Sequence, residues 1–565
     1  MIVRVLFAVV VSLSMFAPLA AQTAPAAAGE IDGGTPKYIK DETPEERRER
    51  VGNEDPGLNP DPNKLFTRKG RQWKIERYDR RFAAYDKGAG LVRPMANVNF
   101  AFEIYQQNDK YVWVWMPTVE ELKTAGEAPL DPQKASLFTE PQIAYLKRIA
   151  PEFEELSVPE ARKVIRFEQS SKGLPSEGSW RNSGTFADMN GDGHLDIIAP
   201  PERGARSIMP AIFLGDGKGG WTPWAAAVWP RELQYGNVVA ADFNSDKKMD
   251  LVFGQHLQAP IVLLGDGKGR FTIANNGMEE QFATRRAAVA DVDADGDLDV
   301  IALWEGPAPG SRVSAGRLRA YINENRAQSW RRVDIAAAEE LVAGDWLAVG
   351  KFNKDRYPDF ATANIYFQRP ETLFRSTGAA KWNVVDWQDG VLVPYLSIYG
   401  PVTTGRFGSR DLDDAIVTYH RTFPTDVNPD LVKQPSYSSV VGIDRISFAG
   451  KQPTRTPILR FAGDRPIGGV ASADFDGDGK NDILYTRHSP REAVLLLGDG
   501  KGRFTRATVE GLDLAENPNY DVSVADVNRD GRPDVLVLFE STSDSPFGRQ
   551  NGSVRFFLNR GGAKQ

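Results

Sequence analysis

Short apolar runs alternate with acidic loops along most of the chain from residue 185 onward. The first copy has Thr185-Phe186-Ala187, a loop that begins at Asp188, and then Asp196-Ile197-Ile198. Corresponding loops begin at positions 188, 242, 291, 351, 406, 474 and 526, which are 49 to 68 residues apart. Repeats of this length, each built from a few short strands, are typical of propeller blades. We therefore expect a mainly β fold with a seven-bladed β-propeller over residues 159–565.

A second recurring element completes each predicted blade. The sequence Leu-Gly-Asp-Gly-Lys-Gly occurs at 214–219, 264–269 and 497–502, each time between an apolar and an aromatic stretch. It predicts a tight hairpin turn, and the lack of a following helix argues against a phosphate-binding loop. The last blade is one strand short, so we expect Val164 to Glu168 to pair there and close the ring.

The region between the N-terminus and the propeller has a different pattern. Residues 22–62 are rich in Ala, Pro, Gly and mixed charge, which predicts a disordered spacer. Residues 63–158 predict a small α+β domain. Its expected elements are helices near Trp73 to Tyr85 and Pro141 to Leu156, and a β-hairpin that turns at Gln107 to Asp109.

Composition narrows the cellular setting and the class of partner. The net charge of -7 offers no polycation for nucleic acid, so nucleic acid is not an expected partner. Arg4, an apolar run and small residues up to Ala21 predict a cleaved secretory signal over 1–21. No later segment is long and apolar enough to span a membrane. The chain has no cysteine, so an exported protein of this sequence needs a stabilising device other than disulfides.

The acidic loops carry the clearest chemistry. Oxygen side chains at loop positions 1, 3 and 5 can turn toward one centre, and an Asp four residues further on can complete a hard oxygen cage for calcium. Five copies in register favour this interpretation over a solvated Asp-rich turn, and about five calcium ions are expected. The predicted ligands are Asp188, Asn190, Asp192, Asp196; Asp242, Asn244, Asp246, Asp250; Asp291, Asp293, Asp295, Asp299; Asp474, Asp476, Asp478, Asp482; and Asp526, Asn528, Asp530, Asp534.

On these motifs the chain from about Lys163 to the C-terminus resembles the FG-GAP or VCBS repeat family, the blades of integrin α-subunit heads and of many exported bacterial proteins. The sixth loop position needs a sharp turn, and Gly occupies it in four copies while Lys247 stands there in the second. Two copies, the fourth and fifth, lack part of the acidic set, and we call them the worn loops. Lys351 replaces the first ligand in the fourth loop, and Arg406 and Arg410 replace the first and third in the fifth, so we expect side-chain cations instead of calcium there.

The resemblance implies a second functional face. Integrin-like propellers carry the calcium loops on one face, so the strand after each loop runs to the opposite face, near the central channel. The residues six positions after each closing Asp are Glu202, His256, Glu305, Ile365, His420, His488 and Glu540. Such a ring could bind a ligand or hold an additional transition metal, with His420 and His488 as the best pair, or it could be an ordinary polar rim.

Residues that precede the innermost strands are expected on the same face. Tyr235, Arg285, Arg286 and Tyr399 are the main candidates, because arginine with aromatic side chains suits sugars, carboxylates or a protein partner. We expect a secreted or periplasmic monomer that binds a glycan or an extracellular protein. The alternative is a metal-dependent polysaccharide lyase or dehydratase with its site at the channel mouth, by analogy of architecture alone.

Overall fold

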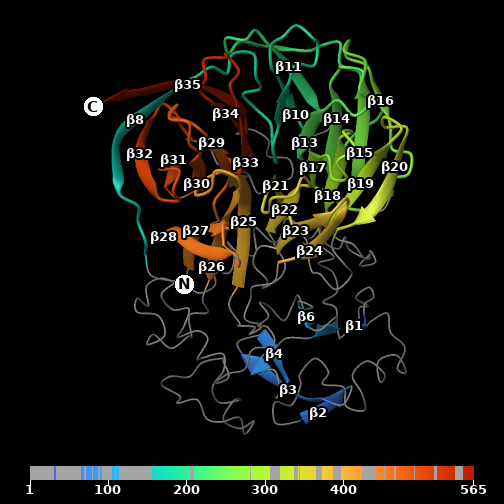
Figure 1. Cartoon of the computed structure of the whole chain (residues 1–565), viewed down its shortest axis with the longest axis vertical. Coiled ribbons are helices and arrows are strands. Elements are labelled where there is room, and N and C mark those ends of the chain that lie inside the picture. The colour runs from blue at the N-terminus through green and yellow to red at the C-terminus, as the bar shows by residue number, and fades with distance from the viewer. Residues whose placement is uncertain are drawn as a thin grey trace.

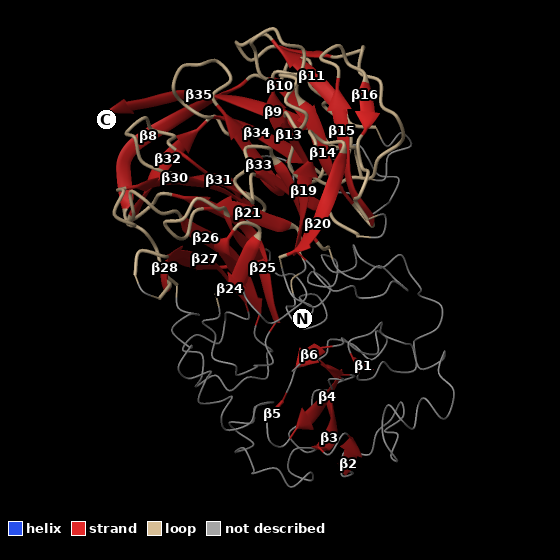
Figure 2. Cartoon of the chain, turned by 45° about the vertical axis from the view of Figure 1, so that its right-hand side comes forward, coloured by secondary structure: helices blue, strands red, loops and turns tan. Residues whose placement is uncertain are grey.

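The computed structural model describes the propeller region from residue 155 onward and, before it, only the backbone of seven short strands. Gaps in the described part fall at 204–208, 280–281, 306–317, 336–341, 343, 364–371, 386–395, 423–438, 451, 464–465, 489, 515–517, 541–551 and 565. The described residues form strands, turns and loops, and none of them forms an α-helix (Figure 2).

Five four-stranded antiparallel sheets follow one another along the chain (Figure 1). The first two contain β9 (Thr185–Ala187), β10 (Asp196–Ala199), β11 (Ala211–Gly215), β12 (Trp221–Pro223), β13 (Val238–Ala241), β14 (Asp250–Gln255), β15 (Gln258–Gly265) and β16 (Phe271–Ile273). The next two contain β17 (Arg286–Ala290), β18 (Asp299–Leu303), β19 (Leu318–Glu324), β20 (Ser329–Asp334), β21 (Trp346–Gly350), β22 (Asp359–Ala363), β23 (Thr372–Gly378) and β24 (Lys381–Val384). The fifth contains β25 (Leu396–Gly405), β26 (Asp414–Thr422), β27 (Ser439–Ser447) and β28 (Thr454–Ala462).

The burial pattern explains why each sheet stands between two others. Every residue of β14, β18 and β22 is buried, as expected for a central strand covered on both faces by neighbouring sheets. The last strand of a sheet is more exposed, and in β24 exposed residues alternate with half-buried ones. Apolar side chains of adjacent sheets pack into shared clusters. One such cluster joins Val252 of the second sheet to Val300 and Tyr321 of the third.

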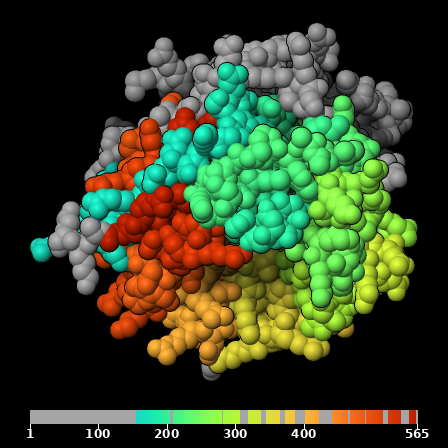
Figure 3. Space-filling model, turned by 90° about the horizontal axis from the view of Figure 1, so that it is seen from above, coloured from blue at the N-terminus to red at the C-terminus, as the bar shows by residue number. Residues whose placement is uncertain are grey.

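The innermost strands form a ring. β9, β13, β17, β21, β25 and β29 (Val470–Ala473) contact one another in chain order, and β29 contacts β33 (Pro518–Ala525). The ring closes where the hydroxyl of Ser523 donates to the carbonyl oxygen of Gly184 at 2.8 Å. Seen from above, the chain runs once around the molecule, and its last residues meet those near 160–200 (Figure 3). This architecture is a β-propeller.

The remaining strands of the propeller region form, with β29 and β33, one eight-stranded sheet. Its order is β29-β30-β31-β32-β8-β35-β34-β33. The strands not yet given are β8 (Glu160–Gln169), β30 (Asp482–His488), β31 (Arg491–Gly498), β32 (Phe504–Glu510), β34 (Asp534–Phe539) and β35 (Val554–Lys564). The predicted closing strand is confirmed, since β8 pairs antiparallel with β35. The sequence did not predict that β8 also pairs, in parallel, with β32.

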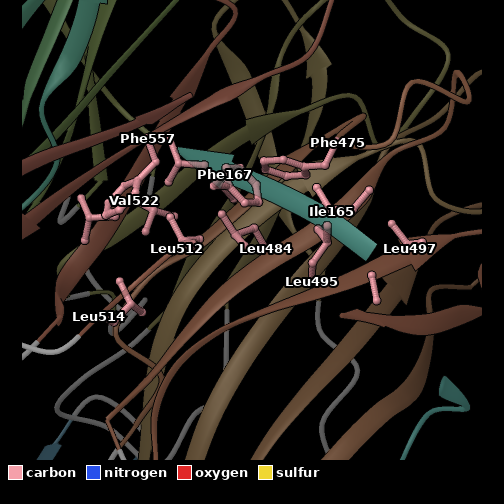
Figure 4. Close-up of a cluster of buried hydrophobic side chains, with 14 of the residues drawn as sticks. Ile165, Phe167, Phe475, Leu484, Leu495, Leu497, Leu512, Leu514, Val522 and Phe557 are labelled. Atoms are coloured by element: carbon pink, nitrogen blue, oxygen red, sulfur yellow. The ribbon is translucent and has the colours of Figure 1, made fainter. Parts of the chain in front are cut away.

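Strand β8 is held by its apolar side chains as well as by its backbone. Ile165 and Phe167 are buried and project into a cluster with Leu484, Leu495 and Phe557, from strands on both sides of β8 (Figure 4). Because these side chains come from both halves of the eight-stranded sheet, β8 joins the two halves through one continuous core.

The hairpin turns predicted from Leu-Gly-Asp-Gly-Lys-Gly are confirmed. In the first copy Gly215 pairs with Trp221, and the Asp216 carboxylate accepts the backbone N–H groups of Lys218 and Gly220, each at 2.8 Å. Gly217 has a φ of 67°, where a residue without Cβ is favoured. The second and third copies close in the same register.

The N-terminal strands correct one prediction. Residues 73–85, expected as a helix, belong to β3 (Arg71–Tyr78) and β4 (Arg81–Asp86), which pair antiparallel. The alternation of Trp73 and Ile75 with polar residues has the period of a strand and explains the error. β3 also pairs with β2 (Leu65–Arg68), and β4 with β5 (Gly90–Leu91).

The hairpin predicted near residue 108 is confirmed by β6 (Tyr105–Gln107) and β7 (Lys110–Val112). β7 also pairs with β1 (Ile31–Asp32), two residues of the expected spacer. The predicted signal over 1–21 and nearly all of the predicted helix at 141–156 lie outside the described residues.

Candidate metal centres and the arginine face

Each acidic loop connects the first two strands of a sheet, and the five intact loops follow one backbone path. The sixth position has a positive φ in all five intact loops, including Lys247 at 67°. The predicted turn is therefore present even without glycine. The fourth position also has a positive φ, at Ser245, Ala294 and Arg529 as well as at two glycines. Backbone of this kind is costly for residues with Cβ, so the loop's hydrogen bonds must hold it.

The first Asp of each loop organises the turn around its own carboxylate. In the sixth loop, Asp474 accepts the backbone N–H groups of Gly477 at 2.8 Å, Asp478 at 3.0 Å and Gly479 at 2.7 Å. Asp188 in the first loop accepts the equivalent three N–H groups. Because these bonds curl the backbone around the carboxylate, they bring the loop's ligand positions together.

The closing Asp links the loop to the third strand of its sheet. Asp299 is fully buried, and its carboxylate accepts the N–H of Val292 at 2.8 Å and the N–H of Asn323, on β19, at 2.7 Å. The same pair of bonds is made by Asp196, Asp250, Asp359, Asp482 and Asp534. This structural role was not predicted from the sequence, which suggested only a metal ligand.

Burial of the closing carboxylates changes their acidity. Desolvation raises the pKa of Asp299 and Asp482 to about 7, although hydrogen bonds from backbone N–H groups oppose the shift. The pKa values of Asp196, Asp250 and Asp534 are raised to about 6 for the same reason. Other carboxylates of the same loop raise the pKa further, so each loop concentrates negative charge that a cation would offset.

Two intact loops bring three carboxylates together closely enough for one ion. One oxygen from each of Asp291, Asp293 and Asp295 lies within 4.8 Å of the others, and so do oxygens of Asp474, Asp476 and Asp482. Oδ1 of Asp293 is buried without a hydrogen-bond partner. A buried carboxylate oxygen with no donor, beside two further carboxylates, fits a hard divalent cation. In the other three intact loops the third position is Asn190, Asn244 or Asn528.

The worn fourth loop satisfies its acidic residues with neutral donors. The Ser376 hydroxyl lies 2.9 Å from both carboxylate oxygens of Asp355, and the Asn353 amide donates to the Ser376 carbonyl at 2.9 Å. Lys351 is exposed, and its backbone N–H donates to Asp413 of the fifth loop at 2.9 Å. The expectation that Lys351 supplies the replacing charge was therefore wrong in detail, because a serine hydroxyl from β23 takes that place.

The worn fifth loop does use a cation, but from another strand. Nη1 of Arg445, on β27, donates to Oδ2 of Asp414 at 3.1 Å. Arg406 and Arg410, the expected cations, are exposed, and Nε of Arg406 lies 4.0 Å from Asp413. Burial raises the pKa of Asp414, while Ser447 and Arg445 lower it through hydrogen bonding and charge. The Arg445 guanidinium thus supplies the positive charge that offsets the buried Asp414 carboxylate.

We call the opposite surface, formed by residues that precede the innermost strands or follow the second strands, the arginine face. Four of the predicted residues lie together there. Nδ1 of His256 is 3.0 Å from Glu305, and Nε of Arg285 is 3.3 Å from the other oxygen of Glu305. The rings of Tyr235 and His256 stack with centroids 4.6 Å apart. The predicted convergence of these residues is therefore observed within the second and third sheets.

Ion pairs extend this cluster across the ring. Arg285 contacts Asp345 at 3.1 Å, and Arg181 lies 4.0 Å from the same carboxylate. Arg286, on β17, donates to Asp521, on β33, at 2.5 Å. Burial lowers the pKa of Arg285, but Asp345 and Glu305 outweigh that effect and raise it above its ordinary value. The Arg181–Asp345 and Arg286–Asp521 pairs join parts of the chain whose sheets are not neighbours in the ring, so they link its opposite sides.

Further residues complete the cluster on one side. Arg203, which was not singled out from the sequence, donates to Glu540 at 2.5 Å and lies over the Tyr235 ring at 5.8 Å. Glu202 accepts the backbone N–H of Ser179 at 3.1 Å. The position of Arg203, one residue after the predicted ring member Glu202, is the signal that would have found it.

The histidine pair is not brought together by any contact among the described residues. His420 is buried within the fifth sheet, where its Nε2 lies 3.2 Å from the carbonyl oxygen of Gly463. The backbone of His488 ends β30 and pairs with Arg491. The side chains of His488 and Tyr399 and the whole of Ile365 lie outside the described part. The fourth histidine, His194, is exposed in the first loop as expected.

Comparison with known proteins identifies the repeat. Residues 463–537 match the FG-GAP-like repeat family, and this segment contains the whole sixth loop. Nothing among curated proteins matches the sequence. The crystal structure of the V. cholerae biofilm matrix protein Bap1 is similar to this chain at 11% identity and a TM-score of 0.32, over 72% of this chain and 89% of that one. Within the described residues no helix could cross a membrane. The chain is thus a β-propeller protein that carries FG-GAP-like repeat sequence.

Proposed function

We propose that this protein is an exported, calcium-binding β-propeller that acts as a binding module for a glycan or an extracellular protein. The observation that carries the proposal is the repeated loop geometry, in which five loops follow the same backbone path and two of them bring three carboxylates together. An exported protein without cysteine cannot form disulfides, so ions bound in its loops would stabilise the fold instead. Residues 1–21 would direct export and be removed.

The domain assignment is part of this proposal. The eight-stranded sheet would count as the sixth and seventh blades, joined through β8, so that residues 159–565 form a seven-bladed ring. Residues 22–62 would be a spacer, and residues 63–158 a small separate domain. We expect the protein to be a monomer, because a closed ring leaves few sheet edges for pairing.

Calcium would bind in the five intact loops through the carboxylate and amide oxygens of positions 1, 3 and 5 and the closing Asp. Calcium prefers six to eight oxygen ligands in flexible geometry, which suits loops rich in backbone carbonyls. The worn loops would bind none, because Ser376 and Arg445 already satisfy Asp355 and Asp414. An added transition metal at the histidines is a weaker expectation, since His420 is engaged inside its own sheet.

The arginine face is the candidate ligand surface. Its charged members are compensated in pairs, and Arg203, His256 and Arg286 also keep 28%, 17% and 15% of their side chains exposed. Guanidinium groups beside a Tyr235–His256 stack suit the hydroxyls and flat faces of sugars or the side chains of a protein. The buried position of His420 favours this binding role over the enzyme alternative, which required a histidine-held metal at the channel mouth.

The test is a screen of the calcium-loaded, mature protein against glycan and extracellular-protein arrays. The affinity of any ligand found is then measured for the Arg203→Ala and Arg166→Ala variants. Arg166 serves as the control, because its guanidinium makes an exposed ion pair on β8. We expect the first variant to weaken binding by about tenfold and the second to leave it unchanged. Equal binding by both variants would remove the arginine face from the proposal. Cleavage of an acidic polysaccharide by the wild type would instead favour a lyase.

A further inference from the structure

The segment that leads into the propeller crosses the outside of several sheets, and we call residues 155–172 the strap. Leu156 exchanges backbone hydrogen bonds with Arg460, on β28, at 2.9 and 2.8 Å. β8 then lies between β32 and β35. The carbonyl oxygen of Ser170 accepts the indole N–H of Trp221, on β12, at 3.0 Å. The strap therefore contacts the fifth sheet, both halves of the eight-stranded sheet and the first sheet.

One side chain of the strap reaches a predicted calcium ligand. Nζ of Lys163 donates at 2.6 Å to Oδ2 of Asp476, the predicted ligand at position 3 of the sixth loop. The Asp476 side chain is 6% exposed and that of Lys163 is 36% exposed, so the carboxylate of the pair is shielded from solvent. The two residues are 313 positions apart in the sequence. Lys163 thus places a fixed positive charge against the cation centre of this loop.

The third loop provides a natural comparison, because its four predicted ligands are also all Asp. Its third position is Asp293, whose Oδ1 is buried without a hydrogen-bond partner. Lysines in the second and sixth loops pair with Asp246 and Asp478, but both belong to the same loop as their partner. Among the described residues, Asp476 is the one predicted ligand that forms an ion pair with a cation from outside its loop. The two all-Asp loops therefore differ at this carboxylate.

We propose that Lys163 is a built-in competitor for the divalent cation at the sixth loop, so that calcium binding there and docking of the strap oppose each other. This inference rests on the proposed calcium function. An ammonium group and a calcium ion that share one carboxylate repel each other, and partial burial of the site limits screening by salt. Because coupling between two binding events is reciprocal, the strap lowers calcium affinity and calcium loosens the strap by the same factor.

The coupling gives the sixth loop a role that differs from those of the other intact loops. The four loops without an outside cation would stay loaded at low calcium and support the fold. The sixth would fill last, at a concentration set by Lys163, and its filling would weaken the hold of β8 between β32 and β35. The strap follows directly on residues 1–154. Calcium occupancy of the sixth loop would therefore change how firmly the segment that joins that region to the propeller is docked.

Hydrogen exchange followed by mass spectrometry during a calcium titration of the mature protein tests the proposal loop by loop. We expect the midpoint of calcium-induced protection for residues 474–482 to lie about tenfold above that for residues 291–299, within the usual range of coupled sites. We also expect amides of residues 160–169 to exchange faster as the sixth loop fills. The second readout needs no variant, so it holds even if a substitution disturbs folding.

Lys163→Met removes the charge and keeps an unbranched side chain of similar reach. We expect it to bring the midpoint of the sixth loop to within about twofold of the third and to abolish the effect of calcium on residues 160–169. Arg166→Gln, which removes an exposed charge on the same strand, should change neither value. An unchanged or higher midpoint in Lys163→Met, or calcium-independent exchange of β8 in the wild type, would overturn the proposal.

The outcomes separate this inference from the calcium proposal on which it rests. If no loop gains protection with calcium, the proposed calcium function fails. If residues 188–196, 242–250, 291–299 and 526–534 gain protection while residues 474–482 do so at the same midpoint with and without Lys163, calcium binding stands and the competition fails.

Discussion

The intact third loop and the worn fifth loop both end in a buried Asp but surround it with different groups. In both, a fully buried Asp closes the loop, Asp299 in one and Asp414 in the other. The third loop adds three converging carboxylates, whereas the fifth adds the guanidinium of Arg445. The comparison teaches that a buried closing Asp is common to both loops. Under the proposed calcium function, the residues at positions 1, 3 and 5 would decide whether the compensating cation is a metal ion or a side chain.

The largest expected effect comes from removing a closing carboxylate. Asp299→Ala leaves the backbone N–H groups of Val292 and Asn323 buried without an acceptor, at about 1 to 3 kcal/mol each. We expect the free energy of unfolding to fall by about 2 to 5 kcal/mol in calcium-free buffer, measured by urea denaturation. Asp411→Ala, at a carboxylate whose side chain is 72% exposed, serves as the control. A loss below about 0.5 kcal/mol for Asp299→Ala would mean that this Asp is only a metal ligand.

A smaller loss is expected from removing the internal cation of the fifth loop. Arg445→Met leaves Asp414 buried beside no positive charge, and breaking a buried pair in this way costs about 3 kcal/mol. Arg406→Met, at a guanidinium that is 64% exposed, should change stability by less than about 0.5 kcal/mol. Equal effects of the two variants in thermal denaturation would contradict the assignment of Arg445 as the compensating cation.

The intact loops should also make stability depend on pH when calcium is absent. Burial holds the pKa of Asp299 and Asp482 at about 7, above the value of about 3.9 in an unfolded chain. The folded protein then binds more protons than the unfolded chain, so this stabilisation is complete below about pH 4 and is lost as pH rises through 6 to 7.

Thermal denaturation of calcium-stripped protein from pH 5 to 7.5 checks this prediction. We expect the free energy of unfolding to decrease over this range, and the decrease to shrink when calcium is added because the ion favours the charged carboxylates. A stability that rises with pH in the stripped protein would be inconsistent with the raised pKa values.

The smallest effect is expected in the fourth loop. Ser376→Ala removes the hydroxyl that donates to Asp355, and a hydrogen bond to a half-buried carboxylate is worth about 1 kcal/mol. A modest decrease in the urea midpoint is the expected result, and Thr372→Ala tests whether hydroxyl loss elsewhere on β23 has the same effect. If Ser376→Ala instead gives a protein that binds one more calcium ion, the hydroxyl was what kept this loop from binding the ion.

Much of the ring was predictable because its signals are local. Loop spacing gave the order of the sheets, the Gly-Asp-Gly-Lys-Gly turns gave their third and fourth strands, and the apolar run at Val164 gave the closing strand. Residues 73–85 were expected to form a helix, although Trp73 and Ile75 alternate with polar residues at the period of a strand.

The features that sequence reasoning missed depend on contacts between distant residues. Arg445 acts on a loop that closes 31 positions earlier, and Lys163 on a loop 313 positions later. His420 was expected at the rim because it follows its closing Asp by six residues, but β26 runs to Thr422 and keeps that position inside the sheet. Periodicity gives the position of a residue in a repeat, but not the length of the strand around it.

The central claim is that five loops bind calcium and two do not. Its most direct test is elemental analysis of the purified mature protein after dialysis against calcium buffer, with protein concentration from its 12 tryptophans. The account predicts about five calcium ions per chain, falling by one in an Asp291→Ala, Asp293→Ala variant. A stoichiometry near zero, or near seven with the worn loops filled, would contradict it.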